Sequence, residues 1–215
     1  MHHLYKNRPL QLGLGAIVGI AVFVLAAQWS QQYSTTLQAA TSEAGIFGIF
    51  AYISIMAVSI IVAPIGTGFL VPAAANSFGP FLAAVYSIVG WTIGSVVAFI
   101  LARYITQTVF SDVVILKRIK EVEQKIPRWY LYALIIVLRM ALPVDVVSYV
   151  LAVASTISFR AFLVTTVIGI TPLTFAFTYA ALSTLWVQVS VAIGSTVLFL
   201  GGLLFTKRML TKPTE

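Results

Sequence analysis

The sequence predicts an all-α integral membrane protein with four transmembrane helices and two re-entrant helical hairpins that enter from opposite faces. The 215 residues are 60% hydrophobic and only 9% charged, whereas soluble domains carry about 25% charged residues. Pro and Gly interrupt the apolar stretches, which membrane helices tolerate. The basic residues stand in short polar breaks between these stretches, as the positive-inside rule requires.

The composition also excludes several functions. The net charge of +7 comes from residues that flank apolar segments, so we expect no nucleic-acid partner. There is no cysteine, which excludes disulfides and Cys-based metal sites. His2 and His3 are the only histidines and are adjacent near the N-terminus. We therefore expect neither an enzyme nor a bound cofactor.

The first predicted span is Leu12 to Trp29, which has the length needed to cross about 30 Å of hydrocarbon. Lys6 and Arg8 precede it and place the N-terminus in the cytoplasm. A charged start before an apolar run also resembles a signal peptide, but this run is long for that role. Gln31 to Glu43 is then a polar segment on the outer side.

The next apolar stretch runs from Gly45 to Ala102. Two full crossings would leave Arg103 outside, against the positive-inside rule. We therefore predict a hairpin, residues 45–80, that dips in from outside. A single span, residues 81–102, then crosses to the cytoplasm.

The tip of this first hairpin is marked by Pro64, Gly66 and Pro72. Proline removes a backbone donor and clashes with the preceding helical turn, and glycine adopts conformations that other residues avoid. An uninterrupted helix is thus disfavoured here.

Residues 104–129 are too polar to cross a membrane. Their apolar residues recur at spacings of three and four, with charges between them, and Ser111-Asp112 is a suitable helix start. We predict an amphipathic helix on the cytoplasmic surface.

The second hairpin is predicted for residues 130–158. A full crossing here would place Arg160 outside, so the segment must dip in from the cytoplasm and return, with its tip near Pro143. Each arm has about a dozen residues, or about 18 Å, which is too short to span.

Residues 161–186 then cross outward and residues 187–205 cross back, which leaves both termini in the cytoplasm. Residues 1–215 form one membrane domain, in which 45–102 and 130–186 are two hairpin-plus-span units of inverted orientation. Transporters often build a central site from such repeats. Six simple helices with proline kinks remain the alternative.

Arg139 and Asp145 are the ionisable residues predicted to lie deep in the membrane, where unpaired charges are expensive. Pro143 breaks the helix between them, which allows both side chains to face one site. Arg139 would bind an anionic headgroup, with Asp145 as its proton-accepting or charge-balancing partner. Two structural alternatives stay open. Asp145 could cap a helix at the amide of Val147 or Ser148, and Arg139 could form an ion pair with Asp145.

Arg103 and Arg160 stand at the cytoplasmic boundary, where arginine commonly anchors a helix and where a headgroup could also arrive. Gly90 and Gly94 form a small-xxx-small pair, which favours close helix packing.

The segment Leu138 to Tyr149, LRMALPVDVVSY, resembles the Arg-x-x-x-Pro-x-Asp-x-x-Ser-Tyr signature of VTT-domain proteins, the DedA and SNARE-associated Golgi protein superfamily. Ser158 to Phe162 and Gly169 to Pro172 follow at the spacing seen in that family. The Gly90 to Gly94 span, ending in Ala102-Arg103, is similar to its Gly-x-x-x-Gly helix. The resemblance covers roughly Ile60 to Ser183.

The resemblance implies lipid translocation by facing re-entrant hairpins: flipping of a polyprenyl phosphate carrier in bacterial members and phospholipid scrambling in eukaryotic ones. The first hairpin, residues 62–80, lacks the acidic residue of the DedA branch, so the chain resembles the branch without it. Protons stay open as a partner, although that absence puts proton coupling in doubt.

We therefore expect a flippase or scramblase for an anionic lipid in the plasma or inner membrane. A transporter of a small ion or solute and a membrane scaffold remain alternatives, and the sequence leaves a homo-oligomer open. The expected substrate-binding or transport residues are Arg139, Pro143, Asp145, Ser148, Arg103, Arg160, Pro64, Gly66 and Pro72.

Overall fold

The computed structural model describes residues 8–62, 67–109, 123, 126–141 and 144–211, and within them it is helical, without strands. The elements are α1 (Arg8–Gln32), α2 (Ser34–Val62), a 3-10 turn η2 (Thr67–Leu70), α3 (Val71–Phe78), α4 (Pro80–Val109), α6 (Arg128–Ala141), α7 (Val144–Ala154), α8 (Phe159–Ala181) and α9 (Leu185–Thr211).

Three apolar helices are long enough to cross a membrane, counted over the described part of the chain: Glu43–Ile61, Pro80–Tyr104 and Phe159–Ala181. The predicted all-α membrane protein is confirmed.

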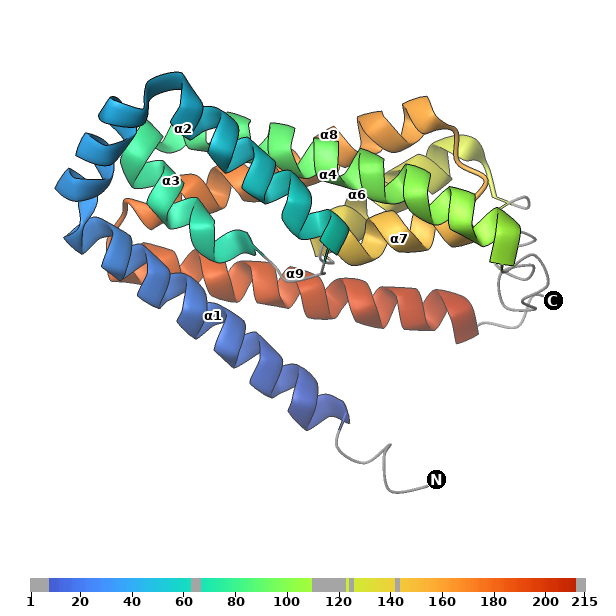
Figure 1. Ribbon diagram of the computed structural model, residues 1–215. Coiled ribbons are helices and arrows are strands. Elements are labelled where there is room, and N and C mark those ends of the chain that lie inside the picture. The colour runs from blue at the N-terminus through green and yellow to red at the C-terminus, as the bar shows by residue number, and fades with distance from the viewer. Residues whose placement is uncertain (1–7, 63–66, 110–122, 124–125, 142–143, 212–215) are drawn as a thin grey trace.

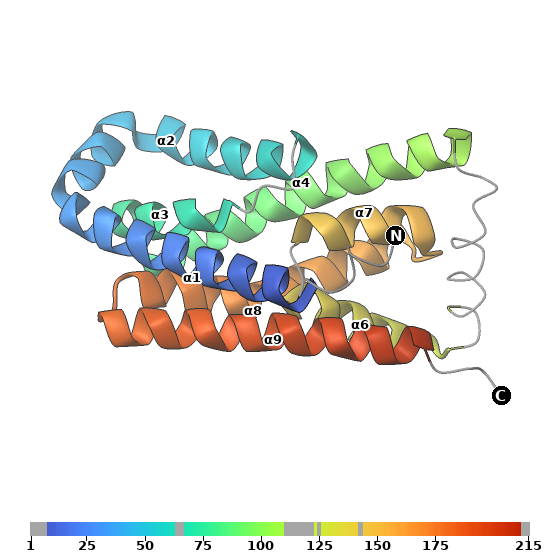
Figure 2. The same cartoon turned by 90° about the horizontal axis from the view of Figure 1, so that it is seen from below.

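Two pairs of helices lie at opposite ends of a set of three long helices. Figures 1 and 2 show α4, α8 and α9 running along most of the molecule, while α2 and α3 lie at one end and α6 and α7 at the other. In each of these pairs the second helix runs back toward the end from which the first one came. This arrangement has the form of two helical hairpins at opposite ends of the molecule. Their re-entry into the membrane stays a prediction, because the first arm, Glu43–Ile61, is itself long enough to cross.

The first hairpin begins at a kink. Gly45 has φ 51° and ψ −129° inside α2, a conformation that side chains with a Cβ rarely adopt. The apolar part of α2 then runs along α4. A Cβ on Gly94 would lie 2.5 Å from the carbonyl oxygen of Ala57, so the two backbones meet closely there. Gly94 lies midway along α4, so this contact joins α2 to the middle of that helix. The predicted packing role of Gly90 and Gly94 is confirmed.

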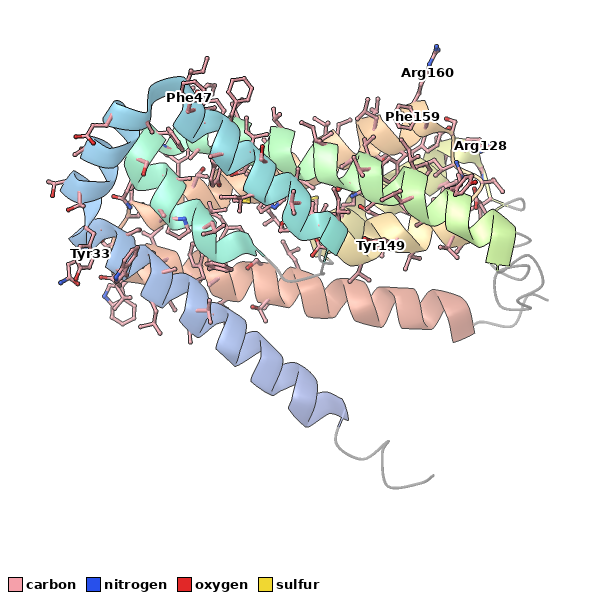
Figure 3. The ribbon with its side chains drawn as sticks, viewed as in Figure 1. Tyr33, Phe47, Arg128, Tyr149, Phe159 and Arg160 are labelled. Atoms are coloured by element: carbon pink, nitrogen blue, oxygen red, sulfur yellow. The ribbon has the colours of Figure 1, made fainter. Side chains whose placement is uncertain are left out.

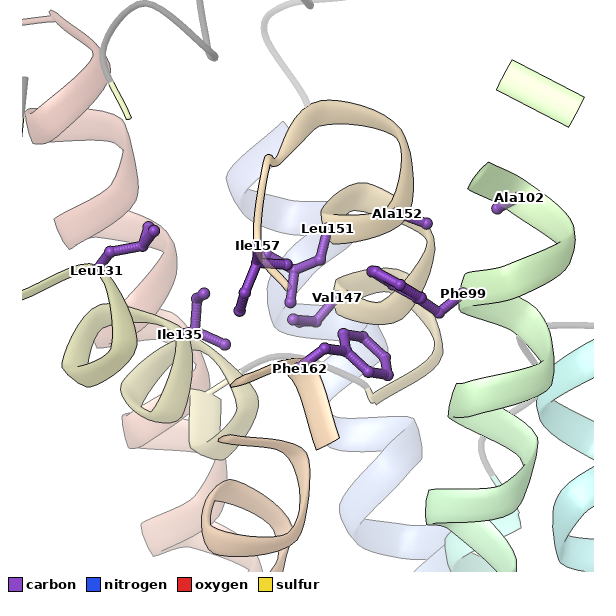
Figure 4. Packing of buried hydrophobic residues seen from close by; sticks show 9 residues of the cluster. All are labelled: Phe99, Ala102, Leu131, Ile135, Val147, Leu151, Ala152, Ile157 and Phe162. Carbon is purple, nitrogen blue, oxygen red and sulfur yellow. The ribbon is translucent and has the colours of Figure 1, made fainter. Parts of the chain in front are cut away.

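The second hairpin has arms of 14 residues in α6 and 11 residues in α7, which confirms the predicted short arms. It packs into the main apolar core with α4 and α8 (Figure 4). The buried members of this core are Phe99, Ala102, Leu131, Ile135, Val147, Leu151, Ala152, Ile157 and Phe162.

The two hairpins touch through Tyr149 of α7. Its hydroxyl donates to the carbonyl oxygens of Ile60, at 3.3 Å, and Ile61, at 3.0 Å, near the end of α2. Figure 3 shows Tyr149 at this junction. The last carbonyls of a helix have no partner within the helix, so this hydroxyl satisfies groups that would otherwise be orphaned.

Several predicted boundaries were wrong. The segment 31–43 is helical almost throughout, because α1 continues to Gln32 and α2 starts at Ser34. Helix α4 extends to Val109, into the range expected for the surface helix, and α8 ends at Ala181, before the predicted Trp186. Hydropathy marks where side chains leave lipid, whereas the backbone can continue its helical hydrogen bonds into the polar region. Most of the expected surface helix, including Ser111-Asp112, lies outside the described residues.

Candidate functional site

Arg139 lies in the last turn of α6 and is 2% exposed. Gly169 of α8 makes room for it. A Cβ on that glycine would lie 2.8 Å from the Cβ of Arg139 and 3.2 Å from the carbonyl oxygen of Ile136. The close approach of α6 to α8 therefore fixes the base of the Arg139 side chain.

The guanidinium of Arg139 is only partly satisfied. Its Nη1 donates to the Ser148 hydroxyl at 3.4 Å. The central guanidinium carbon, Cζ, lies 4.8 Å from the centre of the Phe162 ring. Its Nε and Nη2 are buried and have no partner among the described residues. These two nitrogens form the side-on fork of a guanidinium, the edge that binds two oxygens of a carboxylate or phosphate. That edge is the open one.

Asp145 is also buried, in the first turn of α7. In the described part of the chain, no ion pair joins it to Arg139, and no amide of Val147 or Ser148 donates to it. Both structural alternatives are therefore wrong: Asp145 lies inside the helix, past the capping position, and Arg139 turns toward Ser148 instead. A carboxylate in a first helical turn is stabilised by the helix dipole.

A stacked aromatic pair stands between two arginines. The rings of Phe99 in α4 and Phe162 in α8 have centroids 4.0 Å apart and an interplanar angle of 30° (Figure 4). The Arg139 guanidinium lies over Phe162, and that of Arg103 lies over Phe99 at 4.6 Å. Cations over aromatic faces gain about 0.5–1 kcal/mol at exposed sites and about 2 kcal/mol when desolvated. The aromatic pair thus joins α4 to α8, and Arg139 adds α6 to the same contact.

Arg103 also holds the connection from α7 to α8. Its Nη1 donates to the carbonyl of Ile157 at 3.1 Å and its Nη2 to that of Ser155 at 2.9 Å. These bonds give Arg103 a structural role at the boundary, which is more specific than the anchor expected from the sequence.

Glu123 contacts the same connection. Its carboxylate accepts bonds from the Thr156 amide, at 3.1 Å and 2.8 Å, and from the Thr156 hydroxyl, at 2.7 Å. Glu121 and Glu123 both stand in a stretch of lysines, and nothing in that pattern distinguishes Glu123 from an ordinary surface charge.

The remaining expected residues do not join Arg139. Arg160 is exposed and points away from the helices (Figure 3). Pro72 is buried at the start of α3, where its carbonyl accepts a bond from Asn76 at 3.1 Å. The positions of Pro64, Gly66 and Pro143 lie outside the described residues.

The sequence reasoning missed the roles of Phe162, Gly169 and Tyr149, although all three stand inside the segments that carried the family resemblance. It missed two hydroxyls altogether. Thr92 and Ser95 of α4 have buried oxygens without a partner among the described residues.

A family model described as the VTT domain matches residues 60–183. The chain belongs to the VTT-domain family. The match includes Arg139 and the residues described above as its neighbours, and it agrees with the range over which the resemblance was predicted. No curated protein and no solved structure gives a significant match. This VTT-domain protein is an integral membrane protein, in agreement with its long apolar helices.

Proposed function

We propose that this VTT-domain protein moves lipids with anionic headgroups between the leaflets of the membrane. One observation carries the proposal: the buried Arg139 keeps its Nε and Nη2 fork open among the described residues.

A buried cation without a counter-charge is destabilising by several kcal/mol. Folded proteins rarely keep such a group unless a ligand uses it, and buried polar groups nearly always have partners. An anion that visits Arg139 would relieve the cost while it is bound. The planar fork suits two oxygens of one anionic group.

The surroundings favour a lipid as the carrier of that anion. The apolar arm of α2 presents large hydrophobic side chains to its surroundings, among them Phe47, Phe50, Ile55 and Val58. Residues of this kind suit contact with acyl chains, and Tyr149 connects the end of this arm to the hairpin that holds Ser148. A lipid could keep its tails along this face while its headgroup reaches the interior.

The charge distribution favours one orientation. The end of α4, the start of α6 and the end of α9 lie at the same end of the molecule (Figures 1 and 2). That end carries Arg103 and Arg128, so the positive-inside rule assigns it to the cytoplasm.

The test uses purified protein in vesicles that contain fluorescent phosphatidylglycerol or phosphatidylcholine, with an impermeant quencher outside. Wild-type protein should expose inner-leaflet phosphatidylglycerol to the quencher, and Arg139→Ala should abolish this. Arg128→Ala removes an exposed arginine from the same helix and should leave the rate unchanged. A wild-type protein that passes free phosphate or sulfate but no lipid would support the small-anion alternative.

A further inference from the structure

Four buried side-chain nitrogen or oxygen atoms have no hydrogen-bond partner in the described part of the chain: Nε and Nη2 of Arg139, the hydroxyl of Thr92 and the hydroxyl of Ser95. Other hydroxyls on α4 and α8 bond to a carbonyl one turn earlier. Ser87 donates to Ala83 at 2.7 Å and Thr174 donates to Ile170 at 2.7 Å. Serine and threonine normally satisfy themselves this way inside membrane helices. Thr92 and Ser95 are exceptions.

The two hydroxyls share a face of α4. Thr92, Ser95 and Phe99 are spaced three and four residues apart, so they form one stripe along the helix. This stripe is opposite to Gly90 and Gly94, which face α2. Because Phe99 stacks on Phe162, the stripe faces α8. Both hydroxyls therefore point into the α4–α8 contact.

They also lie at the depth of the Arg139 side chain. That side chain starts beside Gly169 and ends over Phe162, two positions about 10 Å apart along α8. Helices α4 and α8 run in opposite directions (Figure 1). Moving from Phe99 toward Thr92 is therefore the same direction as moving from Phe162 toward Gly169, and it covers the same length.

We propose that Thr92 and Ser95 complete, with Arg139, a binding subsite for a phosphate group. The inference rests on the proposed function and adds two hydroxyls of α4 that determine its specificity. The guanidinium fork supplies two donors in one plane, and the hydroxyls of α4 supply two more from another helix. A planar carboxylate is satisfied by the fork alone, whereas the tetrahedral phosphate has further oxygens for the hydroxyls. The subsite thus selects phosphate over carboxylate.

The test measures binding by calorimetry, with dihexanoyl phosphatidic acid, inorganic phosphate and acetate as probes for the purified full chain. Wild-type protein should bind both phosphates more tightly than acetate. Thr92→Val with Ser95→Ala should weaken phosphate binding about tenfold or more, as expected for lost bonds to a charged group, and should leave acetate binding unchanged. Thr171→Val with Thr174→Val, which removes two hydroxyls that each bond to a carbonyl of their own helix, should bind as wild type.

Thr92→Ser keeps a hydroxyl and should retain phosphate binding, which separates the lost donor from a packing defect. Tighter binding of phosphatidic acid than of inorganic phosphate would assign the ligand to a lipid, and the reverse order would assign it to the free ion. Wild-type phosphate binding in the Thr92→Val, Ser95→Ala variant would overturn the proposed subsite. So would a wild-type protein that binds neither phosphate. Calorimetry measures binding and the vesicle assay measures transport. The subsite can therefore be confirmed or overturned whatever the transport assay shows.

Discussion

Met56 occupies in the first half of the molecule the position that Arg139 occupies in the second. Gly90 and Gly169 are each the eleventh residue of a long helix, α4 and α8. A Cβ on Gly90 would lie 2.6 Å from the Cβ of Met56 and 3.0 Å from the carbonyl oxygen three residues earlier. A Cβ on Gly169 would lie 2.8 Å from the Cβ of Arg139 and 3.2 Å from the carbonyl oxygen three residues earlier. The two halves use one helix crossing, and only the second places a charge there.

Met56→Arg should destabilise the protein severely. Met56 is fully buried, and a guanidinium there would lack the Ser148 bond available to Arg139. An uncompensated buried charge costs about 3–5 kcal/mol. Thermal unfolding in detergent should show a large drop for Met56→Arg and a small one for Met56→Leu. Equal melting temperatures for the two variants would contradict the structural account of this position.

Gly169→Ala should reduce lipid movement more than Gly90→Ala does. Both substitutions force a methyl group into a neighbouring helix, at a cost of about 1–3 kcal/mol. Only the first displaces Arg139. Transport and thermal unfolding should be measured on both. An equal loss of transport in the two variants would mean that the crossing matters only for stability.

Tyr149→Phe should weaken the contact between the two hairpins. The change removes the hydroxyl that bonds to Ile60 and Ile61 while keeping the ring. Losing bonds to two carbonyls should lower the stability by about 1–2 kcal/mol. Tyr179→Phe alters an exposed tyrosine on α8 and serves as the control in the same unfolding measurement. An unchanged Tyr149→Phe protein would argue against this junction.

Arg103→Ala should destabilise the protein, whereas Arg160→Ala should not. Arg103 bonds to two carbonyls of the α7–α8 connection and lies over Phe99, while Arg160 is exposed. Proteolysis of purified protein should cut the Arg103→Ala variant faster near residues 155–158. Equal rates of cutting in the two variants would show that Arg103 does not stabilise the α7–α8 connection.

The helix breaks that separate α2 from α3 and α6 from α7 were predictable because prolines act locally, whereas re-entry of these helix pairs stays a prediction. The number of membrane crossings before Arg103 and before Arg160 determines on which side of the membrane each arginine lies. A proline interrupts a helix whatever surrounds it. Gly90 and Gly94 were recognisable for the same reason, since their spacing alone places them on one face.

The partners of Arg139 were not predictable in this way. A break at Pro143 shows that Arg139 and Asp145 can leave a common helix, but it does not say which way each side chain turns. That direction depends on Gly169 and Phe162, which approach from a helix that follows later in the chain. The open hydroxyls of Thr92 and Ser95 depend on rotamers, and the bond from Thr156 to Glu123 depends on tertiary packing.

The most direct test of the central claim is the initial rate at which Arg139→Lys vesicles expose fluorescent phosphatidylglycerol to an external quencher. Lysine keeps the charge and removes the fork formed by Nε and Nη2. The rate should fall about tenfold or more below that of wild type, with unfolding temperature and vesicle insertion unchanged. A wild-type rate in Arg139→Lys, and also in Arg139→Ala, would contradict the claim that this guanidinium binds the headgroup during transport.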